Sequence, residues 1–297
     1  NILLAFFADE EASGTYGSRW LVKNRPELFA GFSEAVSEVG GFSVTISGGH
    51  RLYLVEAAQK GIAWIKLSAK GTAGHGSFIN TNNAVTKLSD AVSRIGNYQW
   101  PQVLTKTTGQ FFKKVADLTG DKFDPKNVQP LLKHLGNAVK MLGATISNTA
   151  NPTMLEAGYK ANVIPQNASA VIDGRFLPGY ENDLHETIKK LAGDEIEVEV
   201  LTRDIALEAE FAGPLVEAMC KAINVEDSAG IPVPYLMSGG TDNKALHDLG
   251  IVGYGFSPLR LPNDLDFFAL FHGVDERVPI DGLKFGVRVL YEFLENI

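Results

Sequence analysis

The sequence predicts an α/β fold in which a mostly parallel sheet with helices receives an inserted α+β domain. Three observations lead to this prediction. The unbroken apolar run at residues 2–7 is typical of a parallel strand buried on both faces. Residues 61–203 follow the order strand, helix, strand, strand, helix, strand, which is the ferredoxin-like pattern. Beyond Arg203 the alternation of helix-length and strand-length segments resumes. We therefore expect one α/β domain in two pieces, 1–59 and 205–297, with residues 60–204 inserted.

Periodicity justifies the individual elements. In the inserted domain, residues 62–68 alternate as a half-buried strand does, Asn82 or Asn83 can cap the next helix, and Gly193 suits the position just after another helix. The expected elements there are a strand at 62–68, a helix at 85–95, a helical insertion near 100–150 with helices at 111–118 and 131–142, strands at 153–162 and 168–176, a helix at 184–191 and a strand at 196–200. In the outer pieces they are helices at 18–23, 215–223 and 283–294 and strands at 52–55, 233–236 and 251–256.

Composition excludes several classes of protein. The chain has 297 residues, 45% of them hydrophobic and 21% charged, as in an ordinary globular protein. Its net charge is −8 and it has no block of Lys and Arg, so a nucleic acid partner is not expected. No apolar run approaches the roughly 20 residues of a membrane helix, so no membrane is expected either. The single cysteine, Cys220, suits a reducing, cytoplasmic location and reads as a small buried residue of a helix.

Acidic residues stand where catalytic groups gather in such folds, just beyond the carboxyl ends of strands. Asp9, Glu10 and Glu11 directly follow the apolar run at 2–7, and Glu38 precedes a glycine pair. Adjacent acids point in different directions, so one of Glu10 and Glu11 could bind a metal while the other handles a proton. The alternative is a solvated acidic loop, or acids at the start of a helix, where negative charge is favoured.

Two histidines lie in loops rather than in a predicted core. His75 is flanked by glycines between a strand and a helix, and His272 follows an apolar stretch and is followed by Gly273. A neutral imidazole is a common zinc ligand, whereas a surface histidine without a special role is the alternative for both. The segment around His75 lacks the Lys that a phosphate-binding loop would need.

The remaining candidates could bind a carboxylate. Asn162 and Arg175 close two strands of the inserted domain, and an arginine fork matches a carboxylate, although a surface ion pair is the alternative. Gly240 and Thr241 belong to a glycine-rich turn whose backbone amides could cradle an anion. A Ser-His-Asp site built on Ser238 or Ser257 is disfavoured because the chain has no Gly-x-Ser-x-Gly elbow.

Taken together, these motifs resemble the di-zinc aminoacylase, acetylornithine deacetylase, succinyl-diaminopimelate desuccinylase and carboxypeptidase family, metallopeptidase family twenty. Their order and spacing match that family over nearly the whole chain. The resemblance implies a zinc-peptidase-like catalytic domain with an inserted lid or dimerisation domain, a homodimer formed through that lid, and two zinc ions, with cobalt or manganese as alternatives. The implied roles are general base for Glu10, metal ligands for Glu11, Glu38 and His272, oxyanion stabilisation in the partner subunit for His75, and substrate binding for Asn162, Arg175, Gly240 and Thr241.

One feature departs from the family pattern. A His-x-Asp motif and a bridging Asp should precede the glutamate pair, yet only nine residues precede Glu10 and none is a histidine. We therefore expect this chain to be a C-terminal portion of a longer protein, to be inactive as given, and to hold one metal ion or none.

The resulting hypothesis is a metal-dependent hydrolase, in its full-length form, that cleaves the amide bond of small peptides or N-acyl amino acids with a free carboxylate. The sequence does not distinguish dipeptidase, carboxypeptidase and deacylase activities. The alternative is a catalytically incomplete binding or dimerisation module whose metal site is empty or holds a single ion.

Overall fold

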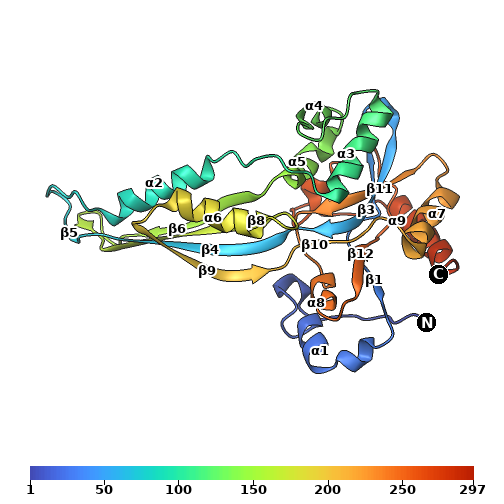
Figure 1. Cartoon of the computed structure of the whole chain (residues 1–297), viewed down its shortest axis with the longest axis horizontal. Helices are drawn as coiled ribbons and strands as arrows, with labels where there is room; N and C mark the ends of the chain where they lie inside the picture. Colours follow the sequence, from blue (N-terminus) through green and yellow to red (C-terminus); the bar gives the residue numbers. More distant parts are fainter. The chain divides into compact units, whose positions relative to one another are not determined.

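The computed structural model describes residues 1–297 and divides them into two compact units (Figure 1). Unit 1 comprises residues 1–59, 103–146 and 207–297, and unit 2 comprises residues 60–102 and 147–206. The outer limits lie within a few residues of those expected from the sequence. The segment 103–146, which we expected in the inserted domain, instead belongs to unit 1. Its apolar helix faces share one core with strands of unit 1, and this burial accounts for its place there.

The sheet of unit 1 is mixed. Its strands are β1 (Glu34–Ser37), β2 (Ser43–Thr45), β3 (Arg51–Gln59), β10 (Leu207–Glu208), β11 (Ile231–Met237) and β12 (Val252–Gly255). The parallel pairs β1–β12 and β3–β11 contain most of the paired residues, whereas β2, β10 and a single pair from β12 meet β3 in the antiparallel sense. The α/β fold expected from the sequence is confirmed.

Strand β3 is apolar over much of its length because both of its faces are buried. Leu52 and Leu54 pack against the helical segment 103–146, whereas Tyr53 and Val55 pack against α7 and α9. The helices of unit 1 are α1 (Ser18–Asn24), α3 (Lys106–Thr119), α4 (Gln129–Leu132), α5 (Val139–Gly143), α7 (Pro214–Glu226), α8 (Asn243–His247) and α9 (Ile280–Leu294). None of the helices in the chain combines the length and the hydropathy needed to span a membrane.

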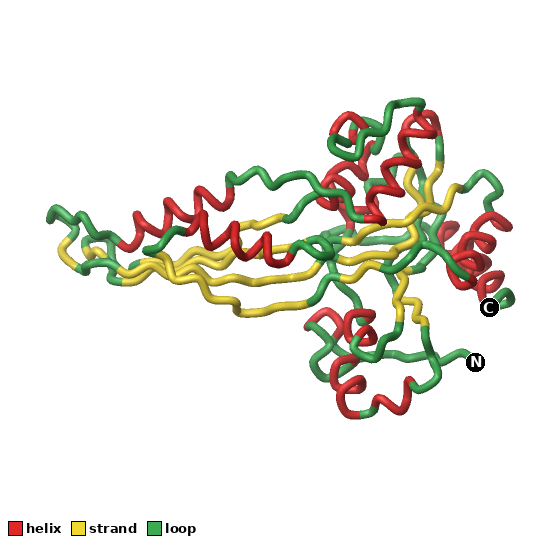
Figure 2. Tube along the Cα trace, viewed as in Figure 1, coloured by secondary structure: helices red, strands yellow, loops and turns green.

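Unit 2 has the predicted ferredoxin-like order. Its strands β4 (Gly61–Lys70), β6 (Thr149–Ala157), β8 (Asn167–Phe176) and β9 (Ile196–Asp204) form an antiparallel sheet in the order β6-β8-β4-β9. Helices α2 (Ala84–Gly96) and α6 (Glu181–Ala192) cover one face of that sheet, as Figure 2 shows. A separate two-stranded sheet joins β5 (Gly74–His75) to β7 (Val163–Ile164). Asn83 caps α2 as expected, since its side chain accepts hydrogen bonds from the amides of Val85 and Thr86.

Three local predictions were wrong. Residues 2–7 form no strand, because no strand edge pairs with them, and Phe6 is 92% exposed. The single helix expected at 131–142 is broken around Gly136, whose φ of 54° is left-handed. Helix α9 forms where expected, but its apolar stripe through Leu283 and Val287 is exposed, and an adjoining side that includes Phe285 and Val289 is buried instead.

Candidate active site

Four carboxylates from three segments of unit 1 lie within electrostatic range of one another. Glu10 and Glu11 lie on a short 3₁₀ helix (Glu10–Ala12), Glu38 directly follows β1, and Asp242 directly precedes α8. Asp9 supports the first segment, because its carboxylate accepts hydrogen bonds from the amide of Tyr16 at 3.0 and 3.2 Å. Glu10, Glu11 and Glu38 were predicted from their sequence context, whereas Asp242 was not.

Each carboxylate makes ionisation of its neighbours less favourable, because like charges repel. Burial is the main cause that raises the pKa of Glu10 to about 7, and the nearby charges of Glu38, Asp242 and Glu11 add to it. Burial is also the main cause that raises the pKa values of Glu38 and Asp242. A bound proton or a cation would relieve this repulsion, so the cluster favours either one.

His272 approaches the same cluster. Its Nε2 lies 3.8 Å from Oε2 of Glu11, and both side chains are more than four-fifths exposed. The backbone of His272 is left-handed, with φ of 55°, which is uncommon for a residue other than glycine and is seen preferentially at functional sites.

Imidazole and carboxylate donors suit a divalent cation such as zinc. Glu11 and His272 therefore fit as a pair, but no group of three or more His, Cys, Asp or Glu side chains is arranged to hold a metal ion. The types of donor atom suit a metal ion, but the two side chains that lie together are fewer than the ligands a metal site needs.

The turn at Gly240 and Thr241 is hydrogen-bonded to Gln59 of β3. Oγ1 of Thr241 accepts a hydrogen bond from Nε2 of Gln59 at 2.7 Å, and the amide of Thr241 donates to Oε1 of Gln59 at 3.1 Å. Asn243 extends this network, since its Nδ2 donates to Oγ of Ser37 at 2.9 Å. Thr241 is buried, and its hydroxyl and amide both form hydrogen bonds with Gln59. Its side chain therefore stabilises the conformation of the turn.

Two buried charged residues beside the cluster were not predicted from the sequence. Glu56 is 1% exposed and Lys244 is 2% exposed. Burial raises the pKa of Glu56 to about 8, while the hydrogen bond from Gln59 and the charge of Lys244 act in the opposite direction. A lone glutamate within an otherwise apolar strand was the available signal, but nothing in the sequence indicated what it would contact.

In unit 2, the structure brings His75 and Asn162 together. His75 pairs with Val163 across β5 and β7, and the amide of Gly76 donates to the carbonyl oxygen of Asn162 at 2.9 Å. The amide of Ser77 donates to Nδ1 of His75 at 3.3 Å, and Oγ of Ser77 lies 2.8 Å from the same nitrogen. The amide contact favours the neutral tautomer with its proton on Nε2, which would leave that nitrogen as a hydrogen-bond donor.

Arg175 is engaged within its own strand. Its Nε and Nη2 donate to the two carboxylate oxygens of Asp173 at 2.6 and 2.9 Å. This bidentate ion pair is the alternative that the sequence left open for Arg175. A substrate carboxylate would have to compete with Asp173 or share the guanidinium with it.

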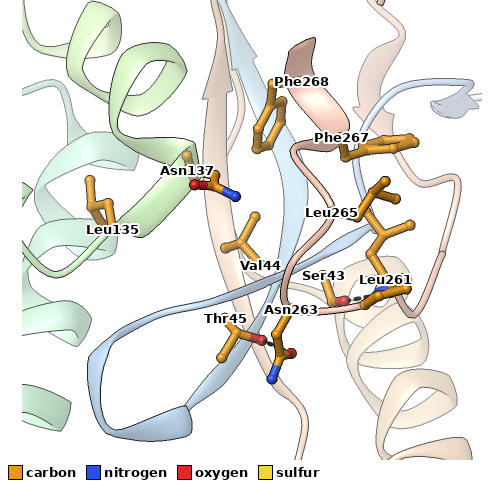
Figure 3. A pocket seen from close by; sticks show the side chains of 12 residues that line it. Ser43, Val44, Thr45, Leu135, Asn137, Leu261, Asn263, Leu265, Phe267 and Phe268 are labelled. Atoms are coloured by element: carbon orange, nitrogen blue, oxygen red, sulfur yellow. Dashed lines mark hydrogen bonds between the residues drawn. The ribbon is translucent and has the colours of Figure 1, made fainter. Parts of the chain in front are cut away.

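A small cavity of about 30 Å³ lies elsewhere in unit 1, between β2, the segment 135–138 and the loop 261–268 (Figure 3). Its polar lining is internally paired, because Thr45 donates to Asn263 at 2.6 Å and Ser43 accepts from the amide of Leu261 at 2.9 Å. Such a volume holds about one water molecule, so this cavity is no substrate site.

Cys220 is no nucleophile candidate, since burial raises the pKa of its thiol to about 11.

Comparison with known proteins adds independent information. Residues 57–198 match the peptidase dimerisation domain of the M20 family. The chain is 26% identical to bovine (Bos taurus) N-fatty-acyl-amino acid synthase/hydrolase PM20D1, over 82% of this chain and 50% of that protein. It is 25% identical to human aminoacylase-1, over 93% of this chain and 59% of that protein. The chain thus spans about half the length of the curated relatives it matches.

Solved structures support the same fold. An M20 family metallo-carboxypeptidase from Sulfolobus solfataricus, Sso-CP2, superposes with a TM-score of 0.67 at 18% identity, covering 97% of this chain and 68% of that one. The di-peptidase Dug1p from Saccharomyces cerevisiae superposes with a TM-score of 0.55 at 12% identity, covering 89% and 57%. The resemblance inferred from the motifs is confirmed: residues 57–198 match the M20 peptidase dimerisation domain, the similar proteins include aminoacylase-1, and the similar structures include an M20 metallo-carboxypeptidase.

Proposed function

We propose that this chain carries part of the active site of a metal-dependent amide hydrolase. The observation that supports it most is the convergence of Glu10, Glu11, Glu38 and His272 in one unit, with the pKa of Glu10 raised to about 7 by burial and by neighbouring carboxylates. The M20 relatives named as hydrolases of N-acyl amino acids or as peptidases support the same reaction class. The proposed substrates are small peptides or N-acyl amino acids with a free carboxylate.

Glu10 is the proposed general base. A carboxylate with a pKa near the working pH can take a proton from an attacking water and return it to the leaving amine. Glu11, Glu38 and His272 are the proposed metal ligands, and a divalent metal, zinc in the first instance, would supply polarisation of the scissile carbonyl when bound.

The groups of unit 2 are proposed to act on the substrate. The Nε2 proton of His75 is a donor suited to a developing oxyanion, and in a homodimer formed through the dimerisation domain it would serve the partner subunit. Asn162 lies beside His75, and Arg175 has the fork that binds carboxylates. Gly240 and Thr241 would border the substrate in unit 1.

Zinc titration of the 297-residue chain tests the proposed ligands. We expect His272→Ala to weaken zinc binding about tenfold or more, because it removes one of the two donors that converge. Glu276→Gln, an exposed acid four residues further along, is the matched control and should leave binding unchanged. Equal affinity in His272→Ala and the unaltered chain would count against the ligand set.

Hydrolysis of N-acetyl amino acids and dipeptides tests the general base. In a full-length version of the protein, Glu10→Gln should lower kcat roughly 100-fold or more while zinc binding stays nearly intact. Arg175→Ala should raise KM for carboxylate substrates and leave KM for their amides unchanged. Unaltered kcat in Glu10→Gln would remove it from the mechanism.

The second candidate function is a binding or dimerising module without catalysis. Two observations favour it: no three metal-binding side chains are in place, and residues 57–198 match a dimerisation domain. A chain that sediments as a dimer, binds no zinc and hydrolyses no substrate with added zinc or cobalt would support the module and exclude the hydrolase for this chain.

A further inference from the structure

The loop that carries His75 is exposed at one end of unit 2 (Figure 1). It runs from the end of β4 to the start of α2 and includes β5. Phe78 is 71% exposed and Ile79 is 98% exposed, so burial of these apolar side chains contributes little to holding the loop in place. Hydrogen bonds therefore determine the conformation of this segment.

Three polar side chains close the base of this loop. Nδ2 of Asn80 donates to the carbonyl oxygen of Thr72 at 2.7 Å, and Nδ2 of Asn82 donates to Oγ1 of Thr72 at 3.0 Å. The backbone reinforces the closure, since the amide of Thr72 donates to the carbonyl oxygen of Asn82 at 2.8 Å. The amide of Asn82 in turn donates to Oδ1 of Asn80 at 2.9 Å. Gly71 permits this close approach, because a Cβ atom there would lie 2.4 Å from the carbonyl oxygen of Asn82.

His75 lies between this closed base and the pairing of β5 with β7. The ring of Phe78 contacts the ring of His75, with their centroids 5.4 Å apart, and the amide of Phe78 donates to the carbonyl oxygen of His75 at 3.0 Å. The arrangement of the imidazole therefore depends on the path of residues 76–79, which the hydrogen bonds at the base constrain. Such constraint matters for a donor to a developing charge, because a donor that is oriented in advance costs no reorganisation at the moment of reaction.

We propose that Thr72, Asn80 and Asn82 are positioning residues, which close the loop 72–82 and thereby hold His75 and Phe78 in a single arrangement. Without this closure the exposed loop gains conformational entropy and populates many arrangements, so the imidazole is aimed less often at any one ligand. The use of His75 as an oxyanion donor rests on the function proposed above, whereas the fixed arrangement of its ring does not.

Hydrogen exchange and proton NMR of the 297-residue chain test this role. In Asn80→Ala/Asn82→Leu the side-chain closure is lost, and we expect the amides of residues 74–79 to exchange about tenfold faster. The ring-current shift that Phe78 causes on the His75 ring protons should decrease at the same time. The stability of unit 2, read from the exchange of β8 peptides in urea, should stay unchanged, because neither replaced side chain belongs to the core.

The matched control is Asn97→Ala, at the opposite end of α2. Asn97 is also an exposed asparagine whose side chain bonds to the backbone, since its Nδ2 donates to the carbonyl oxygen of Ser93 at 2.8 Å. Its replacement should leave the exchange of residues 74–79 and the His75 ring signals as they are in the unaltered chain. Equal loosening of the His75 loop in this control would overturn the proposal.

A conservative variant separates positioning from a general effect on unit 2. In Asn82→Asp the new carboxylate can accept a hydrogen bond from the hydroxyl of Thr72, so the ring signals should stay close to those of the unaltered chain. Thr72→Val removes that hydroxyl and should shift them. Unchanged His75 ring signals in Asn80→Ala/Asn82→Leu, or a loss of unit 2 stability as its sole effect, would overturn the proposal.

Activity distinguishes this proposal from the one on which it rests. In a full-length version of the protein, Asn80→Ala/Asn82→Leu should lower kcat and leave KM nearly unchanged, because the arrangement of His75 matters in the transition state. A loop that loosens as expected while kcat stays unaltered would overturn the catalytic role of His75 and leave the positioning role of the three side chains in place.

Discussion

Asp227 offers a direct test of how buried charge contributes to the stability of unit 1. Its side chain is 5% exposed and accepts hydrogen bonds from Nε of Arg51 at 2.5 Å, from Nη2 of Arg51 at 2.9 Å and from Oη of Tyr53 at 2.8 Å. Arg260 lies further away, at 4.0 Å. The perturbation is Asp227→Asn, which keeps the shape of the side chain but removes its charge and one acceptor oxygen.

The expected cost follows from these contacts. Removing one partner of a buried ion pair costs about 3–5 kcal/mol, because the other charge remains buried without compensation. Arg51 is 20% exposed, so water can partly solvate its guanidinium in the variant, and the lower end of the range applies. We therefore expect Asp227→Asn to lower the free energy of unfolding of unit 1 by about 3 kcal/mol at pH 7.

The pH dependence has a definite sign. Hydrogen bonding from Arg51 is the main cause that lowers the pKa of Asp227 in the folded protein. The stabilisation is therefore complete above the unfolded carboxyl pKa of about 3.9 and is lost as the pH falls through the lower, folded pKa. The difference between the variant and the unaltered chain should narrow only in that acidic range.

Urea-dependent hydrogen exchange is the suitable assay, since peptides from β3 and α2 report unit 1 and unit 2 separately. A loss below about 1 kcal/mol at pH 7, or an equal loss in both units, would refute the reasoning. Adding Arg51→Met to Asp227→Asn should restore part of the stability, because it removes the unpaired guanidinium. No recovery would mean that the cost does not arise from the charge.

The remaining predictions use the same assay or a chemical probe. Gly40→Ala should destabilise unit 1 by more than about 2 kcal/mol, because the residue has φ of 100° and its Cβ would meet the carbonyl oxygen of Gly255 at 2.4 Å; an unaltered transition would contradict the geometry. Asn83→Ala should cost unit 2 about 1 kcal/mol through loss of the α2 cap. Leu88→Ala should cost unit 2 about 2–5 kcal/mol and unit 1 nothing, whereas exposed Asp90→Asn should stay within about 0.5 kcal/mol. Cys220 should react slowly with thiol reagents at pH 8, and rapid labelling would contradict its burial.

Periodicity was sufficient to predict the order of elements where each element buries one face. In unit 2 the strand β4 alternates and α2 has one apolar side, so the ferredoxin-like order follows directly. Periodicity did not predict the buried side of α9, because this helix carries apolar residues on more than one side, among them exposed Leu283 and buried Phe285. A helix of that kind does not reveal which side faces the core.

The site was predictable only in part, for a physical reason. Glu10, Glu38 and His272 are marked by glycines or by position after an apolar run, which are local features of the sequence. Glu56 stands out only as the lone acid of an apolar strand, and Lys244 is marked by nothing local, because burial within the folded unit is what distinguishes both residues. Such burial appears only when the fold is known.

The pairing of the sheet explains why the loops after β1 and β11 meet beside β3. Glu38 follows β1, which pairs with β12, and Gly255 at the end of β12 pairs with Glu56 of β3 in the antiparallel sense. Ser238 follows β11, whose last residue, Met237, pairs with Gln59 of β3 in the parallel sense. Because β1 and β11 run in opposite directions, the two loops meet through these registers and not at one carboxyl edge of a parallel sheet. Catalytic carboxylates on these loops would therefore owe their spacing to the pairing register along β3.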